Sequence, residues 1–178
     1  TYAQAKFQFI NAVGGSVMRV KCSTIDVAST YIIPTAAHTD WHHYGFTVSV
    51  DVGVNVTVRF YYDGVLVDTQ TGTQTTVTDT SVNLTVGAAR TGAEPFSGYI
   101  NQPILGQYLA TDAQFTAVWN LGVGADPTGI FTSYQSFYPF SEVAGTTTGT
   151  IADQAGNQDL EMGPVFLAPF GIITDPPV

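Results

Sequence analysis

Apolar and polar residues alternate along much of the chain, and this period of two predicts β-strands because successive side chains of a strand point to opposite faces. Segment 44–50 places an apolar residue at every even position, with Gly, Thr or Ser between them. The same period recurs at 56–60 and at 82–86. We predict further strands at 7–10, 17–22, 30–33 and 96–104.

The dipeptide Asp63-Gly64 separates the alternating segment 56–60 from the apolar residues Val65-Leu66-Val67. Such a dipeptide is a strong signal for a two-residue β-hairpin turn. The register that follows pairs Tyr62 with Val65, Phe60 with Val67 and Arg59 with Asp68. The face predicted to point inward consists of Val56, Val58, Phe60, Val65 and Val67. Arg59 and Asp68 are then expected to form an exposed ion pair, which contributes roughly 0.2 to 1 kcal/mol.

One short helix is predicted near residues 111–120. Thr111 and Gln114 have the spacing of a capping box, and Phe115, Val118 and Trp119 follow at helical intervals. We expect Gly122 and Gly124 to end the helix, and its apolar side to lie against the sheets. The pattern as a whole predicts a single all-β domain over 1–178, an antiparallel β-sandwich, with a flexible stretch at about 122–136 and a tail at 171–178.

Composition narrows the class of protein. The chain of 178 residues carries a net charge of −9 with only five Lys and Arg, which argues against nucleic acid because such binding relies on basic side chains. No apolar run reaches the roughly 18 to 20 residues that span a bilayer, so membrane insertion is not expected. No signal peptide is visible at the start of the chain, and the single cysteine, Cys22, excludes an intramolecular disulfide.

Four motifs occur in a characteristic order: Trp41-His42-His43, the phrase 58–67 around Asp63-Gly64, Leu84-Thr85-Val86-Gly87, and 96–101. Together they resemble laminin G-like domains of the concanavalin A-like lectin and glucanase superfamily. The resemblance implies a jelly-roll sandwich, a lectin-like module that binds a glycan or a protein surface, and an extracellular location. Asn101 stands where this family commonly has Asp.

Three C-terminal segments look like the opening of such a module: Tyr138–Glu142, Gly145-Thr146-Thr147 and Asp153–Asn157. They follow the predicted closing helix, so the order of the motifs is circular. Two arrangements stay open: the opening strand closes the sandwich of its own chain, or it pairs with a neighbouring subunit.

We expect no enzymatic activity. Some glucanases of this architecture use a Glu-x-Asp-x-x-Glu strand that places two carboxylates on one face. The three glutamates, Glu94, Glu142 and Glu161, have no acidic residue two positions later. A glycoside hydrolase is therefore the least favoured of the function classes.

Two metal sites deserve comparison with structural alternatives. His38, His42 and His43 are near one another in sequence, but neighbouring strand residues point to opposite faces, so a zinc site is not favoured over a structural role. The family resemblance suggests calcium at the rim of the sandwich, and the matching candidates are Asp153, Asn157 and Asp159. An ordinary Asx turn needs the same residue types, and both interpretations stay open.

No ligand-binding residue can be chosen from the sequence. Aromatic side chains that could stack on sugar rings are Tyr31, Tyr61, Tyr108, Tyr134 and Phe137. Two functions remain: a recognition module for glycan or protein, or a structural subunit of a homo-oligomer or viral particle, such as a virion decoration or capsid fibre protein. The expected location is outside the cell or on a particle surface.

Overall fold

The computed structural model describes residues 6–22, 25–50, 55–73, 100, 103–106, 108–120, 125, 127–131, 134–137, 150–151 and 160–161. The chain divides into two compact units. The first consists of Thr1–Val82 with Leu109–Asp126, and the second of Asn83–Tyr108 with Pro127–Val178. The strand predicted at 82–86 and the C-terminal motif at 138–157 lie outside the described residues, apart from two residues of the latter, 150 and 151.

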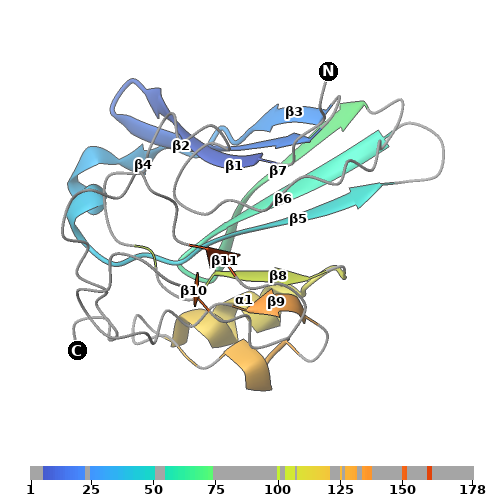
Figure 1. The fold of residues 1–178 in the computed structure, drawn as a ribbon. Coiled ribbons are helices and arrows are strands. Elements are labelled where there is room, and N and C mark those ends of the chain that lie inside the picture. Colours follow the sequence, from blue (N-terminus) through green and yellow to red (C-terminus); the bar gives the residue numbers. More distant parts are fainter. Residues whose placement is uncertain are drawn as a thin grey trace. The chain divides into compact units, whose positions relative to one another are not determined.

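The first unit begins with an antiparallel sheet of β1 (Lys6–Ala12), β2 (Gly15–Cys22), β3 (Ile25–Ala28) and β4 (Ile33–Pro34), in which β2 pairs with the other three strands (Figure 1). The predicted strands at 7–10 and 17–22 are confirmed. The prediction at 30–33 is wrong except for its last residue. The third strand instead lies earlier, where Ile25 and Val27 are buried and Asp26 and Ala28 are exposed.

A second antiparallel sheet has the order β5 (Tyr44–Val50), β6 (Asn55–Tyr62) and β7 (Val65–Thr73). The short helix η1 (Thr35–Thr39) connects it to β4. β5 and β6 contain the alternating segments that predicted them, and β7 follows the predicted Asp-Gly turn. Figure 1 shows the two sheets as separate layers of this unit.

The hydrophobic core lies between these two sheets. Its fully or nearly buried residues come from both layers and are Met18, Val20, Ile25, Val27, Ile33, Val56, Val58 and Phe60. Aromatic rings close the space between the layers: Phe7 stacks on Phe46 with centroids 4.9 Å apart, and Phe9 meets the edge of Tyr44 at 4.7 Å. Burying one such side chain stabilises the fold by roughly 1.5 to 3 kcal/mol. The predicted antiparallel β-sandwich is therefore confirmed.

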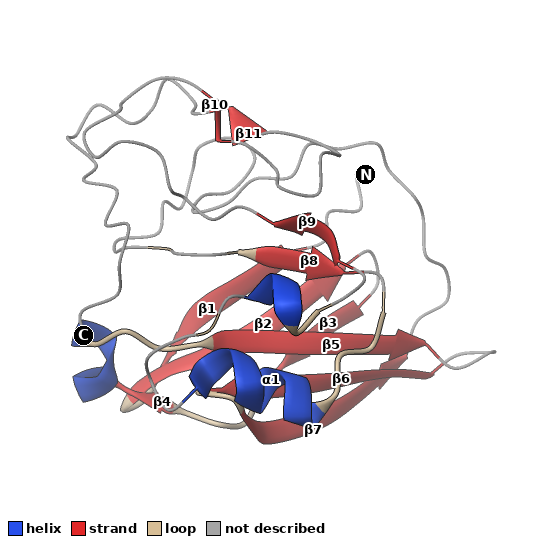
Figure 2. Ribbon diagram, turned by 90° about the horizontal axis from the view of Figure 1, so that it is seen from below, coloured by secondary structure: helices blue, strands red, loops and turns tan. Residues whose placement is uncertain are grey.

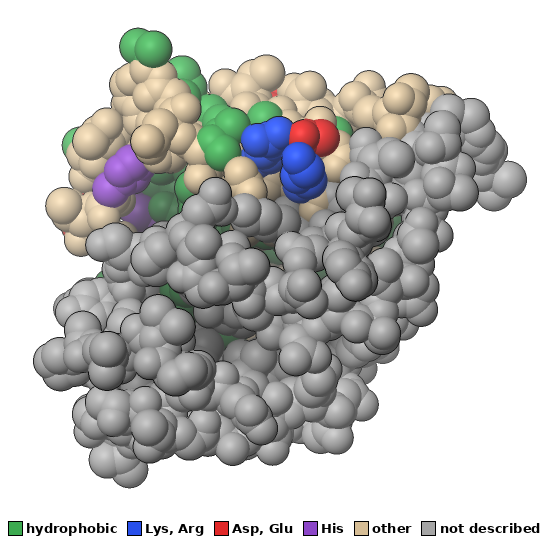
Figure 3. Space-filling model, turned by 45° about the horizontal axis from the view of Figure 1, so that its top comes forward, with side chains coloured by type: hydrophobic (Ala, Val, Ile, Leu, Met, Phe, Trp, Pro, Cys, Tyr) green, Lys and Arg blue, Asp and Glu red, His purple; other side chains and the backbone are tan. Residues whose placement is uncertain are grey.

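Charged residues occupy the outer face of the first sheet. Met18 and Val20 point into the core, so Arg19 and Lys21 point away from it, and both form ion pairs with Asp26 on the neighbouring strand. Basic and acidic side chains are seen next to each other on the surface in Figure 3.

The hairpin register departs from the prediction through a β-bulge. Tyr62 pairs with Val65 as expected, but the register shifts after Tyr61, and Phe60 pairs with Asp68 and Arg59 with Thr69. The extra residue is Val67, which packs against the core. The predicted Phe60–Val67 and Arg59–Asp68 pairs are therefore wrong, because the bulge moves Asp68 to the same side of the sheet as Phe60.

The predicted inward face of the hairpin needs one further correction. Val56, Val58 and Phe60 are fully buried, but the side chain of Val65 is 61% exposed. Val65 begins β7 directly after the turn and, unlike Val67, is not among the residues packed against the core cluster.

Helix α1 (Asp112–Trp119) lies against the outer face of the second sheet, as predicted (Figure 2). The capping box between Thr111 and Gln114 is present in both directions. Asn120 ends the helix in the left-handed conformation with a φ of 44°, so the helix stops before the predicted Gly122. The ring of Phe115 stacks on that of Tyr61 with centroids 3.8 Å apart.

The second unit contains two short antiparallel pairs: β8 (Ile104–Gly106) with β9 (Tyr134–Phe137), and β10 (Thr150–Ile151) with β11 (Leu160–Glu161). The short helix η3 (Pro127–Gly129) also belongs to it. Within the predicted strand 96–104, Ile100 and Pro103 are not in a strand, and β8 starts only at Ile104. No helix of the described residues is long and apolar enough to cross a membrane.

Candidate functional site

The Trp-His-His segment and the Asp-Gly turn bind each other through Asp63. Both turn residues have positive φ, 51° at Asp63 and 73° at Gly64, as a type I′ turn requires. The N–H of Asp63 donates to the carbonyl of His43 at 2.8 Å, and the N–H of His43 donates to Oδ1 of Asp63 at 3.0 Å. Oδ2 lies 2.8 Å from Nδ1 of His42. One carboxylate thus joins the turn to the segment before β5.

The imidazole of His42 lies within a group of aromatic rings. Its ring is 4.9 Å from the ring of Tyr62 and nearly parallel to it, and 6.5 Å from the ring of Trp119. The Tyr62 hydroxyl is 2.9 Å from Nδ1. Burial, followed by the charge of Asp63, raises the pKa of Tyr62, so this hydroxyl keeps its proton at neutral pH.

The His42–Asp63 pair has the geometry of a catalytic dyad but not its access. A proton on Nδ1 satisfies the carboxylate, which leaves Nε2 as the free acceptor of the ring. Nε2 is buried and has no hydrogen-bond partner among the described residues. The side chain of His42 is only 15% exposed and that of Asp63 21%. The pair links the segment before β5 to the Asp-Gly turn.

The three histidines do not converge on a common point. The ring of His43 lies 6.0 Å from that of Phe115, whereas the ring of His42 stacks on that of Tyr62. Burial lowers the pKa of His43 and keeps its ring neutral at pH 7. His38 is exposed in η1. Among the described residues there is no group of three His, Cys, Asp or Glu side chains placed to hold a metal ion.

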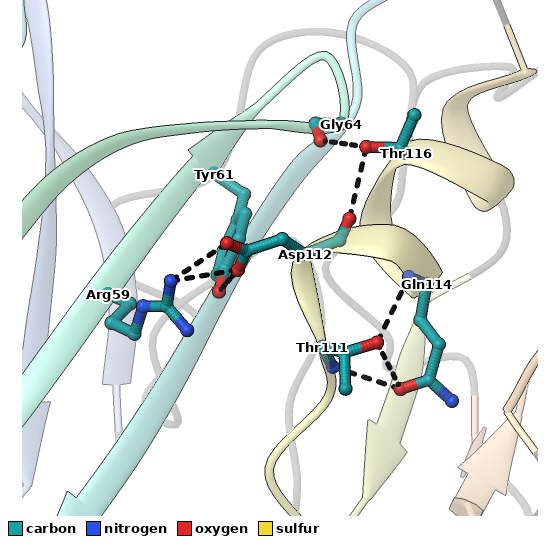
Figure 4. Close-up of polar contacts among 7 residues, drawn as sticks. All are labelled: Arg59, Tyr61, Gly64, Thr111, Asp112, Gln114 and Thr116. Carbon is teal, nitrogen blue, oxygen red and sulfur yellow. Dashed lines mark hydrogen bonds and ion pairs between the residues drawn. The ribbon is translucent and has the colours of Figure 1, made fainter.

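Asp112 fastens helix α1 to the second sheet (Figure 4). Its carboxylate accepts from Arg59 at 2.9 to 3.0 Å and from the Tyr61 hydroxyl at 2.8 Å. Burial, together with the hydrogen bond to Asp112, raises the pKa of Tyr61 to about 12, so the hydroxyl remains a donor. Thr116 adds a second contact by donating from its hydroxyl to the carbonyl of Gly64 at 3.0 Å.

Asp68 joins the two sheets at the bulge. Its carboxylate accepts from the N–H of Thr30 at 2.6 Å, from the hydroxyls of Thr30 and Ser29 at 3.1 and 3.0 Å, and from Gln70 at 3.0 Å. Burial alone would raise the pKa of Asp68, but these hydrogen bonds outweigh it and hold the pKa below its usual value. The turn that follows β3 is thereby fixed to β7.

Four of the five aspartates in the described part of the chain therefore serve as links between elements. These are Asp26, Asp63, Asp68 and Asp112. The fifth, Asp40, is exposed next to the Trp-His-His segment.

The structure excludes one of the candidate aromatic platforms, Tyr61. Tyr61 is fully buried, and Tyr31 packs against the core beside Tyr62 at 5.7 Å. Tyr108 is partly buried, with its ring 6.2 Å from that of Phe131. Only the backbone of Tyr134 and Phe137 is described, as part of β9. The candidate calcium ligands Asp153, Asn157 and Asp159 lie outside the described residues.

Three features together define a laminin G-like jelly roll. They are the β-sandwich, the Trp-His-His segment bound to the Asp-Gly turn, and the helix on the outer face of the second sheet. A sequence model of the concanavalin A-like lectin/glucanases superfamily, laminin G type, matches residues 6–114, more than half of the chain. The chain therefore belongs to this family. A search of curated proteins gave no match. A search of solved structures gave none either.

Proposed function

We propose that the protein is a non-enzymatic recognition module that binds a glycan or a protein surface. Its family contains binding modules of this kind, and the matched region comprises both sheets of the first unit. The proposal places the protein outside the cell, or on the surface of a particle such as a virion, where such partners are presented.

The observation that carries this proposal is that the described aspartate carboxylates bind groups of other structural elements. A glycosidase needs two carboxyl groups on either side of one bond, roughly 5 to 9.5 Å apart, with one of them free to donate a proton. Here Asp63, Asp68 and Asp112 are each bound to groups of other elements, and each lies at a different junction of the fold. Aspartates that link elements in this way make the fold rigid. We infer that the partner is recognised by other groups, exposed on the surface of this rigid fold.

A glycan array probed with the labelled full chain tests the proposal, with the heat-unfolded chain as control. We expect saturable binding to a limited set of glycans or to a host-cell surface extract, without release of reducing sugar from the bound glycans. Silence on the array and on the cell-surface material would contradict recognition. Sugar release that tracks the folded protein would contradict the absence of enzymatic activity.

A structural subunit of an assembly, such as a virion decoration or fibre protein, is the second candidate. The uneven distribution of charge along the chain favours it: all five Lys and Arg lie in residues 1–90, and none in 91–178. An uneven distribution of charge allows the basic residues of one copy to meet the acidic residues of another, as repeated contacts in an assembly require. Copurification with a particle, or its absence, separates this candidate from a free recognition module.

A further inference from the structure

Two adjacent histidines pack against helix α1. The ring of His43 is 6.0 Å from that of Phe115, and the ring of His42 is 6.5 Å from that of Trp119 and nearly parallel to it. Phe115 and Trp119 are four positions apart, so they lie one turn apart on the same side of the helix. The two imidazoles therefore contact successive turns of α1.

Each of these rings has one buried nitrogen without a hydrogen bond. They are Nδ1 of His43 and Nε2 of His42, and no other buried side-chain nitrogen or oxygen of the described residues lacks a partner. The ring of His42 contacts the carboxylate of Asp63 directly, whereas His43 contacts the same carboxylate through its backbone N–H. Because an imidazolium carries a proton on both nitrogens, charging His43 would place a buried N–H at Nδ1 with no acceptor.

Helix α1 approaches the second sheet too closely to adjust to such a change while it stays docked. A Cβ on Gly45 would lie 2.3 Å from the ring of Phe115, and a Cβ on Gly64 would lie 2.8 Å from Cβ of Trp119. Close packing of this kind transmits strain and does not absorb it. Eight residues form a helix too short to be stable alone, so a loss of docking energy acts directly on α1.

We propose that protonation of His43 releases helix α1 from the second sheet, so that the fold contains an acid-sensitive switch at this helix. Neutral His43 packs beside Phe115, whereas the charged ring is stable only where water or another acceptor reaches Nδ1. Release of the helix gives the ring that access. The inference does not depend on the recognition of a glycan or protein.

The charges around His43 were compared for their effect on this switch. The titratable and charged groups of the elements packed around it are Asp63 of the turn, His42 of its own segment, Tyr44 of β5, Arg59 and Tyr61 of β6, and Asp112 of α1. Arg59 and Asp112 pair with each other, and burial raises the pKa of both tyrosines to about 12, so they stay neutral. The carboxylate of Asp63 favours a charged His43, but burial outweighs it and lowers the pKa of His43.

The lowered pKa of His43 sets the direction of the pH dependence. The docked form binds a proton less readily than the released form, so docking is strongest above the unfolded pKa of about 6.5. Docking weakens as the pH falls through that value and stops weakening below the lower folded value. This range lies above the one in which the Asp68 carboxylate loses its charge.

Amide hydrogen exchange of the full chain at pH 7 and pH 5 tests the release. Each rate is divided by that of the unfolded peptide at the same pH, which gives a protection factor free of the intrinsic pH dependence. We expect the α1 amides to be less protected than those of β2 at both pH values, because α1 opens while the sheet stays folded. The protection of α1 should fall about tenfold from pH 7 to pH 5.

Two variants identify the histidine that acts. His43→Phe keeps an aromatic ring beside Phe115 without a titratable group and should abolish the fall in protection. His38→Gln is the matched control, because His38 is exposed in η1, and it should leave the fall unchanged. In the unchanged protein, an NMR titration of the His43 ring should have a midpoint below pH 6.5, shared by the signals of the α1 amides.

Three results would overturn the proposal. Equal protection of the α1 and β2 amides would show that the helix opens only when the whole fold does. A fall in protection that persists in His43→Phe would assign the effect to another group, and its loss in His42→Phe would identify that group as the neighbouring histidine. A His43 ring that titrates without any change in the α1 signals would show that its charge is accommodated with the helix in place.

Discussion

Asp63 combines two roles that are usually assigned to different residues. As the first residue of the turn it adopts a positive φ of 51°, which Asp tolerates better than most residues. Its carboxylate also binds Nδ1 of His42 and the N–H of His43, 21 and 20 positions away in the sequence. The Asp-Gly and Trp-His-His motifs therefore occur together because they form one structural unit.

Substitution of Asp63 separates these two roles. Asp63→Ala loses both the carboxylate and the tolerance for positive φ, and we expect it to lower the free energy of unfolding by about 2 to 4 kcal/mol. Asp63→Asn retains the turn preference and one acceptor oxygen, so it should cost about half as much. Urea unfolding of both variants provides the measurement. An Ala variant within 0.5 kcal/mol of the unchanged protein, the spread of ordinary surface substitutions, would show that the link is not structural.

The lowered pKa of Asp68 predicts that the folded protein loses stability in acid. Its pKa is depressed in the folded state, so its contribution is fully present above the unfolded pKa of about 3.9 and is lost as the pH falls through the lower folded value. We expect Asp68→Asn to cost about 1 to 3 kcal/mol at pH 7, because the N–H of Thr30 and the Ser29 hydroxyl lose a charged acceptor.

The pH dependence of that cost is the decisive measurement. The difference in unfolding free energy between Asp68→Asn and the unchanged protein should shrink as the pH falls from 5 toward 2. Asp26 also has a lowered pKa, but it is present in both proteins and cancels in the difference. A difference that is constant over this range would contradict the role assigned to the Asp68 carboxylate.

Individual residue contacts were predictable only where a local motif, a turn or a helix cap, determined them. Asp63-Gly64 fixed the turn and the Tyr62–Val65 pair, which the structure confirms. The bulge at Val67 inserts one residue without any change in the apolar pattern, so it is not visible in the sequence. From that point the partners of Arg59 and Asp68 change, and both find them in segments far away in the chain.

Helix α1 shows how a short element depends on the surface beneath it. Eight residues form too short a helix to be stable alone, and Phe115 and Val118 are its buried side chains. Gly45 on β5 makes room for the helix, since a Cβ at this position would lie 2.3 Å from Cε1 of Phe115. The Gly in the alternating segment 44–50 is therefore part of the docking surface of the helix.

Gly45→Ala should disturb the helix through this contact. We expect a loss of about 1 to 3 kcal/mol from overpacking. In a Phe115→Leu background the same substitution should cost less, which gives a coupling energy of about 0.5 kcal/mol or more in a double-mutant cycle. Gly129→Ala is the control, because an added Cβ there meets no atom within 4 Å. Additive effects of Gly45→Ala and Phe115→Leu would show that the helix does not rest on Gly45.

Across the whole chain, the alternation of apolar and polar residues predicted the class of fold far better than it predicted the contacts of the candidate site. The alternating segments and the capping box sufficed for the sandwich and the helix, since each depends on local preference and on burial of one face. The short strand β3 was missed because its pattern covers only four residues. The links through Asp68 and Asp112 were missed because they join segments whose proximity only the folded chain establishes.

Calcium binding remains the prediction that most directly connects the C-terminal part of the chain with its family. If Asp153, Asn157 and Asp159 hold calcium, the ion stabilises the folded protein by about 2.7 kcal/mol at a concentration 100 times its dissociation constant, and EDTA reverses the effect. Asp153→Asn/Asp159→Asn should then abolish the calcium-dependent rise in unfolding temperature. An Asx turn built from the same residues predicts no change with calcium or EDTA, and Asn substitutes well for Asp in such turns. Magnesium is the control, because it prefers six ligands in strict octahedral geometry and should stabilise a calcium site much less.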